Sequence, residues 1–406
     1  MTQTTGRNIA SVSWGDHLTF GEADGLLDTQ DKLKRRMEIW KDELGAGVVQ
    51  WRHGRRTRKG RYYTAKNYRR AVGKVRNNMD WDDFEVMPNM AHKFGMEAYL
   101  YVSIYSEGWP LARKKVREVS HHNAMHGQHF AWQSDFSRNN PQYVNVDRSG
   151  ELHQWGVLSL AYEETREYLR TDWLNMLKGY DWDGLFICLR TEARPMDHAD
   201  QFGFNEPIQR DFKQMYGRDI ASEDFDVQAW RDLQGGYFTK FLEELRPELN
   251  GTKLAIGCAR GDVLGPPLGN ATLQWRDWVS KGLIDDLVID QSSSQCPSLW
   301  HPLWPMHRGY GYVQNYLDGH NMPPLVEHIG EYNDFMKDHD TRLYVARQWK
   351  ERSESEEAEL LTTPGVEGLA FSAFRFDNPG PLARDNWVIG PDEEKIEVTI
   401  SGLRLG

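Results

Sequence analysis

Short apolar runs, each followed by a segment with helically spaced apolar residues, recur along the whole chain. Several runs are apolar at both odd and even positions, which is typical of strands buried on both faces of a parallel sheet. There are eight such runs, and they begin at Ile9, Gly47, Met96, Gly184, Leu254, Asp286, Pro324 and Gly368. Strands that alternate with helices predict parallel βα units, and eight units predict an α/β fold of the (β/α)8 TIM-barrel class.

Helical spacing of apolar residues is clearest in three segments between the runs. They are residues 33–44, which end before Gly45, residues 163–177, and residues 226–249. A further helix is predicted over 342–361, before the eighth run. The stretch 295–321 carries no clear helix, so a strand near Tyr312 is an alternative to the seventh run. An open, doubly wound sheet is the alternative fold.

The length of 406 residues exceeds the roughly 250 that a bare barrel needs. The excess is expected in long βα loops, of which residues 106–160 form the longest. In this fold the loops that follow the strands build the binding site. We expect a catalytic barrel over residues 1–384 and a short C-terminal strand extension over 385–406.

The composition, with 39% hydrophobic and 27% charged residues, excludes a mainly disordered chain. No apolar stretch approaches the roughly 20 residues of a membrane span, so no membrane partner is expected. The first residues lack the apolar run of a secretory signal, and the location of the protein is left open. The 16 tryptophans exceed the usual share, and flat aromatic faces are common in carbohydrate-binding clefts.

Charge is distributed unevenly along the chain. The net charge of −11 argues against a nucleic-acid partner. Residues 52–76, however, contain eleven lysines or arginines and no acidic residue. The rest of the chain therefore has 38 basic and 60 acidic residues. The segment is either a solvated surface or a local site for an anion.

The residues at the ends of the predicted strands should gather at one mouth of the barrel. Four are arginines, whose planar guanidinium groups suit sulfate and carboxylate: Arg52, Arg190, Arg260 and Arg375. The alternative is that they pair with neighbouring acidic residues. Aromatic and histidine side chains are expected to line a sugar site there, namely Trp14, His17, Trp51, His53 and Tyr105.

Carboxylates matter because glycoside hydrolysis usually needs two of them. Asp290 is the best candidate, because it directly follows an apolar run, where an unpaired carboxylate is costly. Glu192 is the second candidate, and Glu327 is placed in the substrate site. Glu206, in the triplet Asn-Glu-Pro, is held in reserve, because Pro207 suits the first turn of a helix and a capping role explains the triplet equally well.

No cofactor or metal site is predicted. The histidines lack zinc-like spacing, and no glycine-rich phosphate loop, dinucleotide fingerprint or nucleophile elbow is present. Three cysteines are too few for a disulfide framework, and Cys188 is expected to be a small buried residue of a strand.

The segments PQYVNVDRSGELHQWGVLSLAYEETREYL, DWDGLFICLR and FNEPIQRDFKQMYGRDI, in that order, resemble the glycosyl-hydrolase-like barrels of bacteria. These are distant relatives of the α-galactosidase-type glycoside hydrolases, and the likeness covers roughly residues 9–378. The resemblance implies a general acid after the sixth strand, which falls on Asp290. It also implies a nucleophilic aspartate four residues after Gly184, where this chain has Cys188.

These observations together predict a glycoside hydrolase that cleaves a sulfated or uronic polysaccharide or oligosaccharide by carboxylate acid/base chemistry. A polysaccharide lyase acting on a uronate-containing glycan is one alternative, since an arginine can neutralise the uronate while a histidine or tyrosine removes its proton. A non-catalytic glycan-binding barrel is the other.

Overall fold

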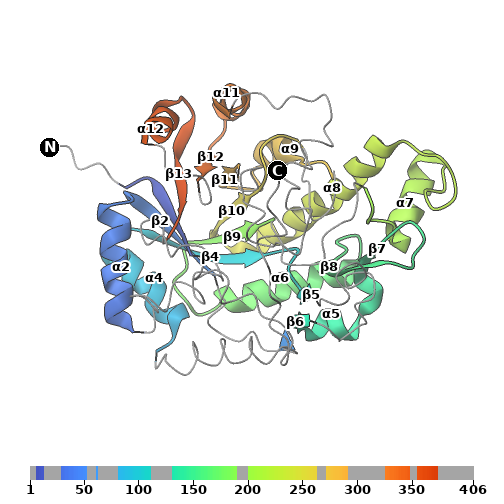
Figure 1. The fold of residues 1–406 in the computed structure, drawn as a ribbon, viewed down its shortest axis with the longest axis horizontal. Helices are drawn as coiled ribbons and strands as arrows, with labels where there is room; N and C mark the ends of the chain where they lie inside the picture. The colour runs from blue at the N-terminus through green and yellow to red at the C-terminus, as the bar shows by residue number, and fades with distance from the viewer. Residues whose placement is uncertain are drawn as a thin grey trace, which may run out of the picture.

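Eight parallel strands close into a barrel at the centre of the molecule (Figure 1). The computed structural model describes residues 6–12, 29–52, 61–62, 81–110, 130–189, 200–262, 271–290, 325–347 and 354–373. In order around the barrel the strands are β1 (Asn8–Val12), β2 (Ala46–Arg52), β4 (Glu97–Ser103), β9 (Gly184–Cys188), β10 (Lys253–Gly257), β11 (Asp286–Ile289), β12 (Arg342–Ala346) and β13 (Val366–Ser372). This confirms the predicted (β/α)8 barrel.

The ladder determines which side chains face the barrel axis. Alternate residues of the strands form an interior core that includes Ile9, Val48, Tyr99 and Phe186. The residues between them, such as Val49 and Leu100, belong to a larger outer core shared with the surrounding helices. This alternation, with both sets buried, explains why the strands read as apolar at every position.

The helices around the barrel agree largely with the sequence. They are α2 (Gln30–Asp42), α4 (Asp83–Lys93), α6 (Glu163–Leu177), α8 (Val227–Leu245), α9 (Trp275–Ser280), α11 (Leu325–Met336) and α12 (Glu354–Thr362). The predicted helices within 33–44, 163–177 and 226–249 are confirmed as α2, α6 and α8. Of these three, α2 and α8 begin at side-chain caps: Thr29 accepts from the Lys32 N–H, and Asp226 accepts from the N–H groups of Gln228 and Ala229.

The prediction for the seventh strand was wrong. The run that begins at Pro324 lies mainly in α11, and the seventh strand is β12, inside the segment 342–361 that was expected to be helical. In α11 the residues His328, Ile329, Tyr332 and Met336 are buried, a spacing that fits one helical face. A short apolar run fits a buried strand or a buried helix equally well, and this explains the error. The alternative strand near Tyr312 lies outside the described residues, as does the predicted C-terminal strand.

The long loop predicted over 106–160 carries structure of its own. Its elements are β5 (Gly108–Pro110), β6 (Phe130–Ser134), α5 (Asp135–Asn139), β7 (Val144–Val146) and β8 (His153–Leu158). β6 is the central strand of one sheet and pairs with β5 on one side and with the two-residue strand β3 (Arg61–Tyr62) on the other. β7 pairs with β8, and both sheets are antiparallel. The loops after β2 and β4 are therefore tied together beside the barrel.

A glycine inside the barrel offers a test of this packing. A Cβ atom on Gly184 would lie 2.7 Å from two ring atoms of Tyr99, whose hydroxyl is held by Asp286 at 2.8 Å. We expect Gly184→Ala to lower the free energy of unfolding by about 1–3 kcal/mol through overpacking, measured by urea denaturation. Gly330→Ala in α11 is the control, because a Cβ there meets no atom within 4 Å. Equal stability of the two variants would contradict the inward position of Gly184.

Candidate functional site at the barrel mouth

The carboxyl ends of the eight strands form one end of the barrel, here called the mouth. Because the strands are tilted, side chains at one height come from alternate strands of the ladder. The register places Arg52 of β2, Cys188 of β9 and Asp290, which follows β11, in one inward-facing layer. This layer lies at the mouth end of the barrel interior, so it forms the base of any site at the mouth.

Asp290 has the most constrained position in this layer. Its side chain is 4% exposed, and its backbone has a φ of 60°, which is the left-handed region that few residues other than glycine adopt. Its Oδ1 atom lies 3.9 Å from Nε of Arg260. A buried carboxylate needs such a partner, and backbone strain of this kind gathers at functional sites.

Arg260 lies in the loop that follows β10. Its side chain is 18% exposed, and its Nη1 atom has no hydrogen-bond partner among the described residues. Tyr332 of α11 holds this loop, because the Gly261 N–H donates to the Tyr332 hydroxyl at 2.7 Å. The arginine is thus positioned beside Asp290 with donor capacity that the described residues do not use.

Two arginines of the predicted set are therefore at the mouth. The Arg52 guanidinium lies 4.8 Å from the centroid of the Tyr101 ring, one step deeper in the barrel. Below it, the amide of Gln50 also faces inward, fully buried, with neither its nitrogen nor its oxygen bonded to any described residue. Buried polar groups normally have partners, so Gln50 is a candidate that the sequence reasoning missed. Its signal was its position, two residues before Arg52 on the same strand face.

Trp51 and Tyr105 do not line the mouth. Trp51 alternates with Gln50 and Arg52, so it faces outward, where its Nε1–H donates to Asp83 of α4 at 2.9 Å. Tyr105 is fully buried in the outer core, and its burial raises the pKa of its hydroxyl. Both were expected in a sugar site, and in this structure neither has the exposed surface that contact with a sugar requires.

Glu327 does not lie at a strand end. It is an exposed residue in the first turn of α11, so it cannot take the mouth position that a seventh strand over 324–330 would have provided. The strand that does end there, β12, is followed by Arg347. That arginine is buried and donates to Glu356 of α12 at 2.5 Å.

Glu206 has the structural environment of a helix start. It is the first residue of α7 (Glu206–Tyr216), its side chain is 71% exposed, and it lies 3.7 Å from Arg210. The neighbouring Asn205 fastens the helix to β7, donating to the Val144 carbonyl and accepting from the Val146 N–H. Figure 1 shows α7 at one end of the molecule, away from β11. The triplet Asn-Glu-Pro is thus explained as an anchor.

Six predicted site residues lie outside the described residues: Glu192, Trp14, His17, His53, Arg190 and Arg375. Their roles stay predictions. Among the residues that the structure does describe, no group of three His, Cys, Asp or Glu side chains could hold a metal ion. Within the same segments, no helix has both the length and the apolar character that crossing a membrane requires.

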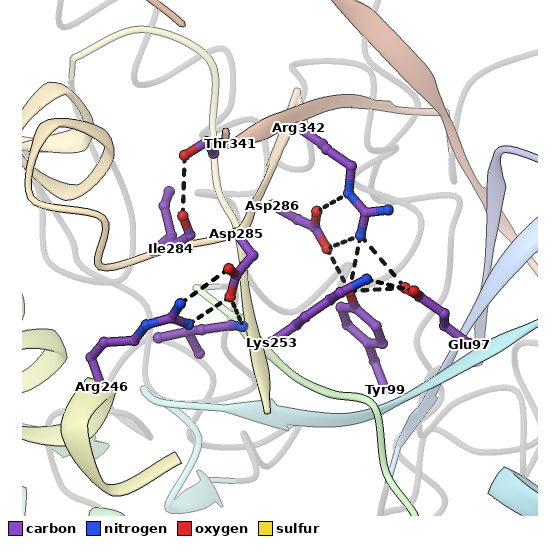
Figure 2. Close-up of polar contacts among 10 residues, drawn as sticks. Glu97, Tyr99, Arg246, Lys253, Ile284, Asp285, Asp286, Thr341 and Arg342 are labelled. Carbon is purple, nitrogen blue, oxygen red and sulfur yellow. Dashed lines mark hydrogen bonds and ion pairs between the residues drawn. The ribbon is translucent and has the colours of Figure 1, made fainter. Parts of the chain in front are cut away.

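The opposite end of the barrel, the floor, is closed by a polar network (Figure 2). Asp286, at the start of β11, binds the Arg342 guanidinium through both oxygens at 2.6 and 3.0 Å and accepts from the Tyr99 hydroxyl. Glu97 pairs with Lys253 at 2.5 Å. Burial raises the pKa of Asp286 and of Tyr99 above their ordinary values. These groups satisfy one another, which indicates a role in stability, as is usual at this end of the fold.

The chain was compared with known proteins. No protein-family model matches it, and no curated protein sequence matches it. Solved structures do resemble it. The glycoside hydrolase domain of PgaB (BpsB) from Bordetella bronchiseptica has a TM-score of 0.52 and 14% identity, over 95% of this chain and 99% of that one. The chain has a glycoside hydrolase-like fold.

Two longer enzymes are also similar. The α-L-fucosidase isoenzyme 2 from Paenibacillus thiaminolyticus has a TM-score of 0.46 at 10% identity, over 94% of this chain and 48% of that one. A β-galactosidase from Marinomonas ef1 has a TM-score of 0.48 at 11% identity, over 90% and 53%. The chain spans about half the length of each. The structural neighbours are glycoside hydrolases, as the resemblance seen in the sequence implied.

His328, buried in α11 near the mouth, provides a test of this environment. Its burial lowers the pKa of its imidazole, an effect that Arg260 and Arg276 reinforce and that Glu331 and Asp262 oppose. The unfolded chain therefore binds this proton more readily, so folding stability is lost as the pH falls through the ordinary histidine range. We expect the free energy of unfolding to fall less between about pH 7 and pH 5 in His328→Gln than in the wild type.

Urea denaturation at several pH values measures this difference. The control is His339→Gln, which changes an exposed histidine just after the same helix and should leave the pH dependence unchanged. An unchanged slope in His328→Gln would show that this imidazole is not held neutral by burial.

Proposed function

We propose that the protein is a glycoside hydrolase that cleaves a sulfated or uronic polysaccharide or oligosaccharide, with Asp290 as its acid/base carboxylate. The observation that supports this most strongly is Asp290 itself. It is buried in the layer that it forms with Arg52 and Cys188, in the left-handed conformation, beside an arginine with a donor that the described residues leave unused. A glycoside hydrolase-like fold supplies the context in which such a carboxylate is useful.

In this mechanism Asp290 donates a proton to the glycosidic oxygen as the bond to the sugar breaks. A second carboxylate must activate water or attack the sugar, and Glu192 is the candidate that the sequence offers. Arg52 and Arg260 would hold a sulfate or a uronate carboxylate by paired, charge-assisted hydrogen bonds. Asp290 and Arg260 would thus act on one substrate from adjacent strands.

A glycan-binding barrel without catalysis is the second candidate, and Cys188 favours it. This residue stands in the same layer as Asp290 and Arg52, at the position where the related barrels are expected to carry a nucleophile. It is 1% exposed and packs in the interior core. A thiol at this position is not the carboxylate that glycoside hydrolysis usually needs.

Replacing Asp290 by Asn tests the proposed chemistry. Asparagine also tolerates the left-handed conformation, so the fold should persist while the transferable proton is lost. We expect the turnover number to fall by about 100- to 10,000-fold. New reducing ends, released from a panel of neutral, uronic and sulfated polysaccharides, are the readout.

Asp334→Asn, on the exposed face of α11, is the matched control and should leave the rate unchanged. Near-normal activity in Asp290→Asn would disprove the assignment. Binding without new reducing ends in the wild type would support the binding barrel, and a product that absorbs in the ultraviolet would indicate a lyase.

Replacing Arg260 by Gln tests the anionic substrate separately. The change removes a positive charge that would hydrogen-bond to the substrate anion, so kcat/KM on a sulfated or uronic substrate should fall by about ten- to a hundredfold. Activity on the corresponding neutral or desulfated glycan should change much less. Arg210→Gln, on the exposed surface of α7, is the control. An equal loss on charged and neutral substrates would show that Arg260 supports the site without recognising an anion.

A further inference from the structure

A cleft lies beside the mouth, between the first turn of α8 and the start of α9. Its volume is about 490 Å³, within the roughly 300–1,000 Å³ of small-molecule sites. We call it the rim cleft, and its lining residues are Gln228, Asp262, Thr272, Leu273, Gln274, Arg276 and Asp277. Both helices begin at the mouth end of the barrel, because each follows a strand that ends there.

The rim cleft is continuous with the candidate site along the chain. Arg260 lies against Asp290, and two residues later Asp262 lines the rim cleft. The Tyr332 hydroxyl holds the residue between them, Gly261, by a hydrogen bond of 2.7 Å. One short, anchored segment therefore joins the two sites.

The polar groups of the rim cleft are mainly acceptors. Oδ1 of Asp262 receives hydrogen bonds from Trp275 and Arg276 at 2.8 and 2.7 Å, while its Oδ2 has no partner among the described residues. The Nε2 atom of Gln228 donates to Asp232 and Thr272, and its Oε1 also has no partner among the described residues. The Asp277 carboxylate is 59% exposed and lies 3.6 Å from Lys281. These exposed oxygens can accept hydrogen bonds, and sugar hydroxyls are suitable donors.

The charge around the rim cleft is negative. Asp262 and Asp277 line it, Asp232 binds its Gln228 and Thr272, and Glu243 shares Lys281 with Asp277. Against these four carboxylates stand two cations, Arg276 and Lys281. A sulfate or a uronate would be repelled here, whereas a neutral ring would not. The mouth, with Arg52 and Arg260, has the opposite preference.

We propose that the rim cleft binds an uncharged, hydroxyl-rich sugar residue of the same glycan whose charged residue lies in the mouth. The inference rests on the proposed function and deepens it. The substrate class is a glycan in which charged and neutral residues alternate or adjoin, and a chain charged at every residue is excluded. Carboxylate and amide oxygens of the rim cleft accept from the sugar hydroxyls, and the negative surroundings reject acidic residues.

Two sets of probes test this substrate class. Hyaluronan and chondroitin oligosaccharides alternate a uronate with a neutral N-acetylhexosamine, whereas oligogalacturonates carry a charge on every residue. With the wild-type protein we expect kcat/KM, measured by new reducing ends at low substrate, to favour the alternating set by about fivefold or more. Binding of each set to Asp290→Asn is measured by calorimetry as a second readout.

Asp277→Lys locates the effect in the rim cleft, because it reverses one exposed charge there. The preference for alternating chains should fall by about fivefold or more relative to the wild type. Asp334→Lys is the matched control, since Asp334 is also exposed on a helix and lies 3.8 Å from Lys337 of that helix. It should leave the preference unchanged.

The outcomes separate this inference from the proposed function. If no member of either set is cleaved or bound, the proposed function fails for uronic glycans, and the rim cleft proposal fails with it. If oligogalacturonates are processed as well as alternating chains, the proposed function stands and the rim cleft proposal is wrong. The rim cleft proposal is also wrong if Asp277→Lys and Asp334→Lys have the same effect on the preference for alternating chains.

Discussion

The hydrogen bonds that close the barrel between β1 and β13 determine what the mouth can contain. Their register pairs Ile9 with Ala370 and Ser11 with Ser372, and it continues through β2, where Ser11 pairs with Gln50. A slip of one residue on β2 would turn Trp51 inward and Arg52 outward. The register of the ladder therefore decides which side chains enter the mouth.

The two ends of the barrel handle buried polar groups in opposite ways. At the floor, Asp286, Arg342 and Tyr99 satisfy one another within a few ångströms, as Figure 2 shows. At the mouth, Nη1 of Arg260 and the amide of Gln50 have no partner among the described residues. Leaving such groups unmet costs free energy, and proteins accept this cost chiefly where a ligand or water completes the bonding. This asymmetry supports the proposal that the functional site lies at the mouth.

Much of the fold could be predicted from the sequence because parallel strands buried on both faces leave an unmistakable apolar pattern. Seven of the eight predicted strands correspond to barrel strands, since each run is bounded by turn residues or by a helix of clear period. The seventh could not be placed, because residues 325–329 are apolar enough for either element and only tertiary packing chose the helix.

The site was less predictable, because several adjacent residues lie at each strand end. Only the register of the barrel determines which of their side chains face inward. Arg52 and Trp51 are adjacent in the sequence, yet one faces the axis and the other binds Asp83 on the outside. The left-handed backbone conformation of Asp290 could not be predicted from the sequence either. Its selection rested on the cost of an unpaired carboxylate after an apolar run, and the structure provides Arg260 as the partner.

Cys188 limits how hydrolysis could proceed at this mouth. The layer formed by Arg52, Cys188 and Asp290 contains one described carboxylate, Asp290, and the residue that β9 contributes is a buried thiol. Under the proposed function a second carboxylate must therefore come from outside this layer, and Glu192, four residues after Cys188 in the sequence, stays the predicted candidate. Retaining enzymes hold their carboxyl groups about 5 Å apart, and inverting enzymes about 6.5–9.5 Å apart to admit a water. Under the proposed function, the separation between Asp290 and the second carboxylate therefore decides between retention and inversion.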